Sequence, residues 1–139
     1  RTNQDPFDSA LRGLKNMILT PHIGGSTEEA QEAIAEFAAE RLLGYLNRGD
    51  TTFSVNLPNV QLAEVSGAHR LLHIHKNQPG VMAELNRELT AAGLNIVGQH
   101  LKTDERTGYV ITDVDKGYDP EALKGLKTVP GTLRFRTIQ

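Results

Sequence analysis

The sequence predicts an α+β protein in which a long helix precedes a small domain of four strands and two helices. From Ser26 to Arg48, apolar residues recur at helical spacing and form one stripe. From His69 onward, short apolar runs alternate with helical patterns in the order strand, helix, strand, strand, helix, strand. This order is typical of the ferredoxin-like layout, in which two helices cover one face of an antiparallel sheet.

Composition narrows the classes of function that the chain can have. Its 139 residues are enough for one small domain and a piece of another. The net charge of −2, with acidic and basic residues interspersed, lacks the basic excess of a nucleic-acid binder. No apolar run approaches the ~20 residues that cross a bilayer. The absence of cysteine excludes disulfides and fits a reducing, cytoplasmic compartment. We therefore expect neither a nucleic-acid nor a membrane partner.

The first residues of the chain read as part of a longer polypeptide. It starts with Arg1 instead of methionine, and the polar stretch Arg1–Asp8 reads as a loop, so we expect a chain cut from a longer one. The apolar run at Asn16–Leu19 ends at Thr20-Pro21, which predicts a buried strand that opens into a loop. His22, Ile23 and a glycine pair follow, and the glycines permit a sharp turn or a close approach to a ligand.

The long helix is predicted from Ser26 to Arg48. Ser26 and Glu29 fit a capping box, and Gly49 stands where a left-handed C-terminal cap is expected. At about 1.5 Å per residue the helix is over 30 Å long, which suggests that it packs against something beyond this chain. Its apolar stripe consists of Ala30, Ala33, Ile34, Phe37, Ala38, Leu42 and Tyr45.

After an irregular stretch over 51–65 and a predicted hinge at Ser66-Gly67, the smaller domain begins. The strand Arg70–His75 alternates, with leucine and isoleucine on one face and two histidines on the other. An amphipathic helix is predicted over Val81–Ala92, and Gly93 ends it.

The second half of this domain completes the pattern. Strands are predicted over 94–101 and 108–114, on either side of a charged turn at 103–107. Asp119-Pro120 supplies a cap and a first-turn proline for a second helix that carries Leu123 and Leu126. After a turn at Pro130-Gly131, the last strand alternates apolar and basic residues, namely Leu133, Arg134, Phe135 and Arg136.

His22 is the first candidate for chemistry. Ligands of open α/β folds gather beyond the carboxyl ends of strands, and a histidine there can exchange a proton near neutral pH. The alternative is a loop histidine that caps a backbone group. Gly24 and Gly25 could bring main-chain amides to a cofactor, although most glycine pairs only form turns.

A second candidate site consists of His75, Asn77 and Asn95. These residues lie at the end of the first strand and the start of the second, and in a strand–helix–strand arrangement they can converge near the sheet edge. Their amides and imidazole offer both donors and acceptors, which suits a zwitterionic amino acid. The alternative is structural, because asparagine is common in turns.

Histidine spacing also raises the hypothesis of a metal site. His69, His73, His75 and His100 include pairs that share a strand face. A metal needs three or four ligands of fixed geometry, and no cysteine or acidic cluster completes such a set. We therefore expect no metal.

Two segments carry a family resemblance. The run Leu19–Gln31, with Thr20-Pro21-His22-Ile23-Gly24-Gly25, closely resembles the catalytic-histidine segment of NAD-dependent D-2-hydroxyacid dehydrogenases, most of all the phosphoglycerate dehydrogenase branch. His75–Val81, with Gly93–Ile96 and Gly108–Val110, is similar to the ACT domain of serine-regulated members of that branch. Both segments occur in the family's order, and the resemblance covers essentially the whole chain.

The resemblance implies a function. Enzymes of this branch oxidise 3-phospho-D-glycerate to 3-phosphohydroxypyruvate with NAD, the first step of L-serine biosynthesis. His22 matches the proton-transfer residue, and His22, Ile23, Gly24 and Gly25 match a segment along the cofactor. His75, Asn77 and Asn95 match positions that bind L-serine between ACT domains of two subunits in a homo-oligomer, expected to be a tetramer in the parent enzyme.

The resemblance also implies domain boundaries. Residues 1–25 would end a nucleotide-binding domain, residues 26–66 would return to a substrate-binding domain, and residues 67–139 would form the ACT domain. The cofactor's glycine fingerprint, the arginine for the substrate carboxylate and the acidic partner of the histidine are missing, so this chain alone is expected to be inactive. Two alternatives are an ACT module for another amino acid and a nucleic-acid module, although the predicted sheet lacks the stacking aromatics of the latter.

Overall fold

The computed structural model describes residues 8–64, 67–115, 121 and 123–138. The chain divides into two compact units, Arg1–Glu36 and Phe37–Gln139. Among the described residues, no helix combines the length and the apolar character that crossing a membrane requires.

The described residues that precede the long helix form turns and irregular segments. The strand predicted at Asn16–Leu19 is wrong for this structure, since Met17–Leu19 has no strand conformation and the Ile18 side chain is 87% exposed. A strand is stabilised by hydrogen bonds to a neighbouring strand. The described residues supply no such neighbour to this run, so its apolar character alone does not make it a strand.

Helix α1 extends over Glu28–Arg48. Its N-terminal cap is Thr27, whose Oγ1 accepts the Ala30 N–H at 3.2 Å, so the capping box predicted at Ser26 is wrong by one residue. The C-terminal prediction is confirmed. Gly49 has φ 75° and donates its N–H to the Tyr45 carbonyl at 3.1 Å, which is the left-handed cap of a helix end.

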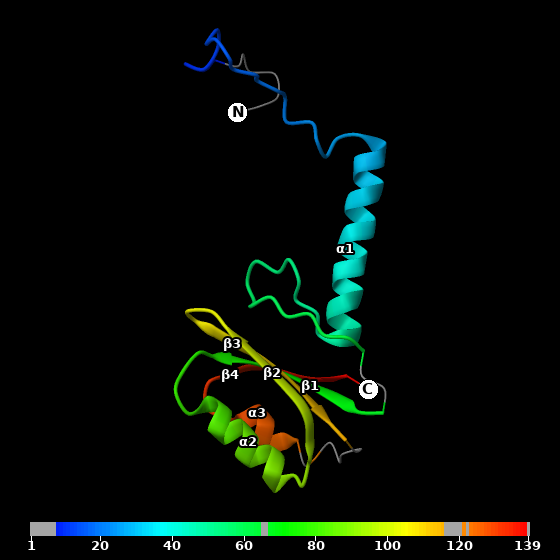
Figure 1. Ribbon diagram of the computed structural model, residues 1–139, viewed down its shortest axis with the longest axis vertical. Helices are drawn as coiled ribbons and strands as arrows, with labels where there is room; N and C mark the ends of the chain where they lie inside the picture. Colours follow the sequence, from blue (N-terminus) through cyan, green and yellow to red (C-terminus); the bar gives the residue numbers. More distant parts are fainter. Residues whose placement is uncertain (1–7, 65–66, 116–120, 122, 139) are drawn as a thin grey trace. The chain divides into compact units, whose positions relative to one another are not determined.

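The Phe37–Gln139 unit contains a four-stranded sheet (Figure 1). Its strands are β1 (His69–Lys76), β2 (Ile96–Thr103), β3 (Thr107–Val114) and β4 (Thr132–Ile138), in the order β2-β3-β1-β4 with antiparallel neighbours. Helices α2 (Val81–Ala91) and α3 (Lys124–Thr128) cover one face. The predicted ferredoxin-like fold is confirmed. The cap predicted at Asp119-Pro120 lies outside the described residues.

Each face of the sheet has its own core. On the helix face, a buried cluster joins the sheet to α2 and α3 through Leu71, Leu85, Leu89, Leu94, Val110, Val114, Leu123 and Leu126. On the other face, Leu72, Tyr109 and Ile111 pack against Val60 from the segment that leads into β1. Both faces of β1 are therefore buried, and the strand's polar residues need partners inside the protein.

The sheet also holds the end of α1 through three side chains. Tyr109 donates its hydroxyl to the Gly49 carbonyl at 2.7 Å, and Arg70 Nη1 donates to the Arg48 carbonyl at 3.0 Å. Arg136 donates to the carbonyls of Tyr45 and Leu46. The last carbonyls of a helix lack partners within the helix and carry partial negative charge, so two guanidinium groups and a phenol stabilise this end.

Candidate functional site

His22 lies on an exposed turn in the first unit. The Ile23 N–H donates to the Pro21 carbonyl at 3.0 Å, and the Ser26 N–H donates to the Ile23 carbonyl at 2.9 Å. His22 is therefore accessible from solvent. A Cβ added at Gly24 would meet nothing within 4 Å, so no neighbouring atom here demands glycine at that position.

These residues fit only one part of a dinucleotide site. They offer an exposed imidazole and the main-chain groups of a turn, and the Gly25 carbonyl already accepts a hydrogen bond from Gln31. Enclosing NAD requires a cradle of phosphate-binding amides that this turn does not build. The segment can complete such a site when other residues supply the cradle.

His73 and His75 lie on the helix face of β1, and each is 2% exposed. Their rings stack with centroids 5.3 Å apart and planes 27° apart. Burial, and then the charge of the neighbouring His75, lowers the pKa of His73 to about 4. Burial also lowers the pKa of His75. Both rings are therefore neutral at physiological pH, and each offers one donor and one acceptor.

Asn77 and Asn95 are exposed, and each donates a hydrogen bond to a segment beyond its own strand. Asn77 follows β1, and its Nδ2 donates to the Asp104 carbonyl at 2.7 Å, while its backbone N–H donates to the Arg106 carbonyl at 2.8 Å. Asn95 precedes β2, and its Nδ2 donates to Asp115 Oδ2 at 3.0 Å. Each side-chain amide thus donates one of its two hydrogens within the chain, and its oxygen can act as an acceptor.

The structure brings His75 and Asn77 together at one end of the sheet, and Asn95 lies at the other. Asn77 follows Lys76, which pairs with Thr107, whereas Asn95 precedes Ile96, which pairs with Val114. Seven residues of strand separate these ends, or about 23 Å. β1 and β2 are both antiparallel to β3 and so run parallel to each other, which puts the end of one far from the start of the other. The expected convergence within one chain is therefore wrong, and the roles of the three residues stay a prediction.

A metal site gains no support from the geometry. Within the described parts of the chain, no group of three or more histidine, cysteine, aspartate or glutamate side chains could hold a metal ion. His100 lies on the exposed edge strand β2, apart from the stacked pair on β1.

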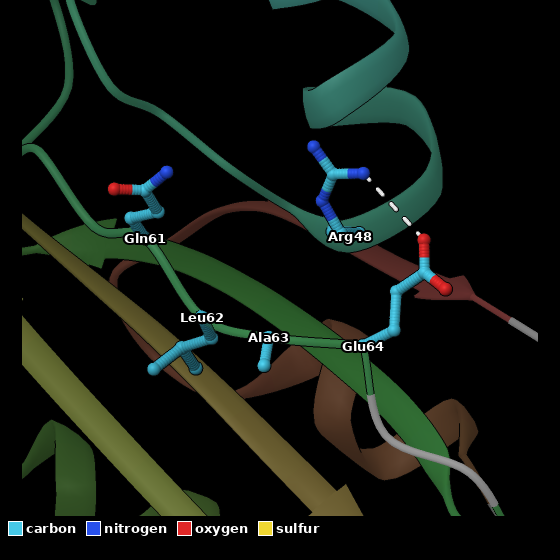
Figure 2. A pocket seen from close by; sticks show the side chains of 5 residues that line it. All are labelled: Arg48, Gln61, Leu62, Ala63 and Glu64. Carbon is cyan, nitrogen blue, oxygen red and sulfur yellow. Dashed lines mark ion pairs between the residues drawn. The ribbon is translucent and has the colours of Figure 1, made fainter.

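An open hollow of about 580 Å³ lies between the end of α1 and the segment that leads to β1 (Figure 2). It is lined by Arg48, Gln61, Leu62, Ala63 and Glu64. Figure 2 shows the Arg48 guanidinium facing the Glu64 carboxylate, 3.5 Å away. The Glu64 side chain is 77% exposed and that of Arg48 is 37% exposed, so this partly solvated pair contributes little to stability. None of the predicted effector residues lines this hollow.

A second hollow of about 610 Å³ follows the predicted apolar stripe of α1, which contributes Phe37, Ala38, Leu42 and Tyr45 to its lining. The Arg41 guanidinium lies 5.3 Å from the centroid of the Phe37 ring and 5.7 Å from that of Phe53. The sequence signal for this surface was the helical spacing of the apolar residues.

Sequence reasoning missed Arg70, Tyr109 and Arg136 as residues that bind the end of α1. Arg136 alternates with apolar residues and reads as part of a solvated strand face, Arg70 is the first residue of a predicted strand, and the tyrosine reads as a β-former. The available signal was the glycine cap at Gly49, because a helix that ends near a sheet leaves carbonyls that need donors.

Comparisons with known proteins agree with the fold. The family model described as AHAS small subunit-like ACT domain matches residues 71–134. D-3-phosphoglycerate dehydrogenase of Escherichia coli (strain K12) is 45% identical over 139 residues, covering 99% of this chain and 34% of the relative. The Haemophilus influenzae protein of the same name is 47% identical over 134 residues, and that of Dictyostelium discoideum is 38% identical over 136 residues. These matches cover 96% and 98% of this chain and 33% of each relative.

A solved structure titled "GqqA- a novel type of quorum quenching acylases" is 20% identical, with a TM-score of 0.41. The match covers 58% of this chain and 45% of the chain of that structure. This likeness is too low to support a functional argument. The chain spans about a third of the length of the curated relatives and matches their C-terminal part. The chain is therefore homologous to the C-terminal third of D-3-phosphoglycerate dehydrogenases, and its sheet and helices form an ACT domain.

Proposed function

We propose that the chain is the C-terminal part of a cytoplasmic, NAD-dependent D-3-phosphoglycerate dehydrogenase and that its ACT domain binds L-serine as a feedback effector. The enzyme would oxidise 3-phospho-D-glycerate to 3-phosphohydroxypyruvate. The observation that carries the proposal is 45% identity over 99% of the chain, which includes the His22 turn and the ACT domain together.

In the proposed reaction His22 takes the hydroxyl proton of the substrate. NAD, when bound, supplies the hydride acceptor. An imidazole in its neutral form can accept a proton, which suits it to this role near neutral pH. His22 lies on an exposed turn. This exposure would let it reach a substrate that other residues of the enzyme hold. The chain alone lacks the groups that hold the substrate, and we expect it to have no dehydrogenase activity.

The proposed serine site requires two copies of the chain, because Asn95 is far from His75 and Asn77 in one. β2 is an edge strand whose unpaired backbone groups can pair with a second sheet. Ile96, Val97 and Leu101 on this strand are exposed. Both features favour self-association through β2.

Antiparallel pairing of β2 with β2 of a second copy brings the parts of the site together. The start of one β2 then lies beside the end of the other. Thr103, at that end, pairs with Gly108, which in turn pairs with His75. Asn95 of the second copy, directly before its own β2, thus approaches the His75 and Asn77 end of the first. Pairing through the other edge strand, β4, would leave Asn95 remote from both residues.

The chemistry of the three side chains suits serine. The free amide oxygens can accept hydrogen bonds from the ammonium group, while the second amide hydrogens and the imidazole can bind the carboxylate and hydroxyl. Serine would then join two subunits and restrain domain motion across the predicted hinge. Ser66 of that hinge lies outside the described residues, and Gly67 has φ 77° with open space around it. Coupling of this kind is typically ~1–3 kcal/mol.

Calorimetry on the 139-residue chain tests the effector assignment. L-serine should bind better than glycine, L-valine or L-phenylalanine, and Asn95→Ala should weaken serine binding at least tenfold, about 1.4 kcal/mol. No serine binding by a folded, self-associated chain would refute the effector proposal. Unchanged affinity in the folded variant would remove Asn95 from the site.

A second candidate is an ACT module that responds to another amino acid. It is favoured by the family model, whose description names an AHAS small subunit-like domain. Preferred binding of valine or phenylalanine over serine in the same experiment would support this candidate.

A further inference from the structure

His73 has no role in the proposed site, yet it is one of the most buried polar side chains of the sheet. It lies between Val110 and Phe135 on the neighbouring strands, with its ring 6.3 Å from that of Phe135. Burying an imidazole in an apolar layer is unfavourable unless its polar atoms have partners. His73 lies two residues before His75, so the two side chains share one face of β1 and can contact each other.

A hydroxyl group fixes the orientation and the tautomer of His73. Thr132 Oγ1 lies 2.7 Å from the Val129 carbonyl oxygen, which can only accept, so the single hydroxyl hydrogen is donated there. Thr132 Oγ1 also lies 2.8 Å from His73 Nε2 and must accept at that contact. Nε2 therefore carries the hydrogen, and Nδ1 of the neutral ring is unprotonated. Among the described residues, that Nδ1 is buried without a hydrogen-bond partner.

His75 is held between this fixed ring and a glycine. Its ring stacks on His73 at 5.3 Å. Its cross-strand neighbour is Gly108, where an added Cβ would lie 2.1 Å from His75 Nε2. The His75 ring thus occupies space that a side chain at position 108 would fill. Its Nδ1 is buried and has no hydrogen-bond partner among the described residues.

We propose that His73 is a positioning residue for the effector site: anchored by Thr132, its ring holds the His75 imidazole in one orientation before the ligand binds. The inference rests on the proposed role of His75 in binding serine. Holding a first-contact side chain in its bound conformation raises affinity, because less conformational freedom is lost on binding.

Two variants separate stacking from general packing. His73→Phe keeps a flat ring against His75 and loses the bond to Thr132, whereas His73→Leu loses both. We expect His73→Phe to keep serine affinity within about twofold and His73→Leu to lose about tenfold. Leu89→Ala is the control, because it removes a fully buried side chain from the same core and leaves both histidines in place. It should lower stability and leave the affinity of the folded chain unchanged.

The histidine spectrum of the isotope-labelled wild-type chain gives a second test that does not depend on the variants folding. His73 should show the Nε2-protonated neutral ring, with short proton–proton contacts to the His75 ring. A Nδ1-protonated or tautomer-averaged His73, or wild-type affinity in folded His73→Leu, would overturn the proposal. If the wild-type chain binds no serine while the spectrum shows the fixed pair, the effector assignment fails and the pairing of the rings stands.

Discussion

Replacing Gly49 by alanine should destabilise the Phe37–Gln139 unit more than the same substitution at Gly93. Both glycines follow a helix with positive φ, 75° at Gly49 and 66° at Gly93. An added Cβ at Gly49 would lie 2.6 Å from Leu72 Cδ2 and 2.7 Å from the Tyr109 hydroxyl oxygen. An added Cβ at Gly93 would meet nothing within 4 Å. The two sites therefore share the backbone cost and differ in the steric cost.

The magnitudes follow from these two costs. An alanine in the left-handed region costs roughly 1–2 kcal/mol at either site. Forcing an extra methyl group into a packed contact adds roughly 1–3 kcal/mol, which applies only at Gly49. The expected loss in free energy of unfolding is thus about 1–2 kcal/mol for Gly93→Ala and about 2–5 kcal/mol for Gly49→Ala. The second loss is a large part of a typical total stability of ~5–15 kcal/mol.

Urea denaturation followed by far-ultraviolet circular dichroism measures both losses by linear extrapolation. The wild-type chain is the reference, and Gly93→Ala is the matched control for backbone strain. Equal losses for the two variants would show that the end of α1 does not pack against Leu72 and Tyr109. The reasoning about the docked helix end would then be refuted.

Three further predictions concern charge, association and pH. Arg70→Met leaves the buried Asp113 carboxylate unpaired and should lower the free energy of unfolding by about 3–5 kcal/mol. The double variant Arg70→Met with Asp113→Leu should lose less. Equal losses of the two variants in urea titrations would contradict this prediction. Leu101→Lys puts charge on the exposed edge strand and should convert the self-associated chain to a monomer in sedimentation, with loss of serine binding; an unchanged sedimentation profile would exclude pairing through β2. The pKa of His73 falls from 6.5 to about 4 on folding, so between these pH values the unfolded chain binds more protons and the free energy of unfolding drops as pH falls. His73→Phe should flatten this pH dependence in urea titrations repeated across that range. An unaltered slope would contradict the prediction.

The topology of the small domain could be predicted because each local signal agreed with the whole. The alternation in β1 placed Leu72 on one face and His73 and His75 on the other, as the structure confirms. Gly49 and Gly93 marked helix ends correctly, because positive φ is a local property that glycine accommodates. The order of strands and helices along the chain predicted one antiparallel sheet with two helices on one face, as the structure confirms.

The failures occurred where structure depends on distant partners. An apolar run such as Met17–Leu19 becomes a strand only beside another strand, and sequence spacing does not show whether one is present. The cap at Thr27 instead of Ser26 is a smaller error, because adjacent hydroxyl residues offer the same chemistry and the backbone path decides between them. The separation of Asn77 from Asn95 required the strand directions, which individual motifs do not contain.

Two arginines of the sheet were the hardest to interpret, because their partners include the end of α1, which lies outside the sheet. Arg136 belongs to an alternating pattern that ordinarily indicates a solvated face, and Arg70 is the first residue of the predicted strand Arg70–His75. Here Arg70 is buried against Asp113 at 2.7 Å and also reaches the Arg48 carbonyl. A buried charge is tolerated only when it is paired and hydrogen-bonded, and the carboxylate and the helix end together meet that demand.

β1 consequently contributes to two interfaces at once. On one face Leu72 lies under Gly49 at the end of α1, and on the other His73 and His75 form the stacked pair. Adjacent residues of a strand point to opposite faces, and packed interiors deform little. A shift of β1 that accommodates a ligand at His75 must therefore also move Leu72 against the helix end. The strand that would contact the effector through His75 thus also packs through Leu72 against Gly49 at the end of α1.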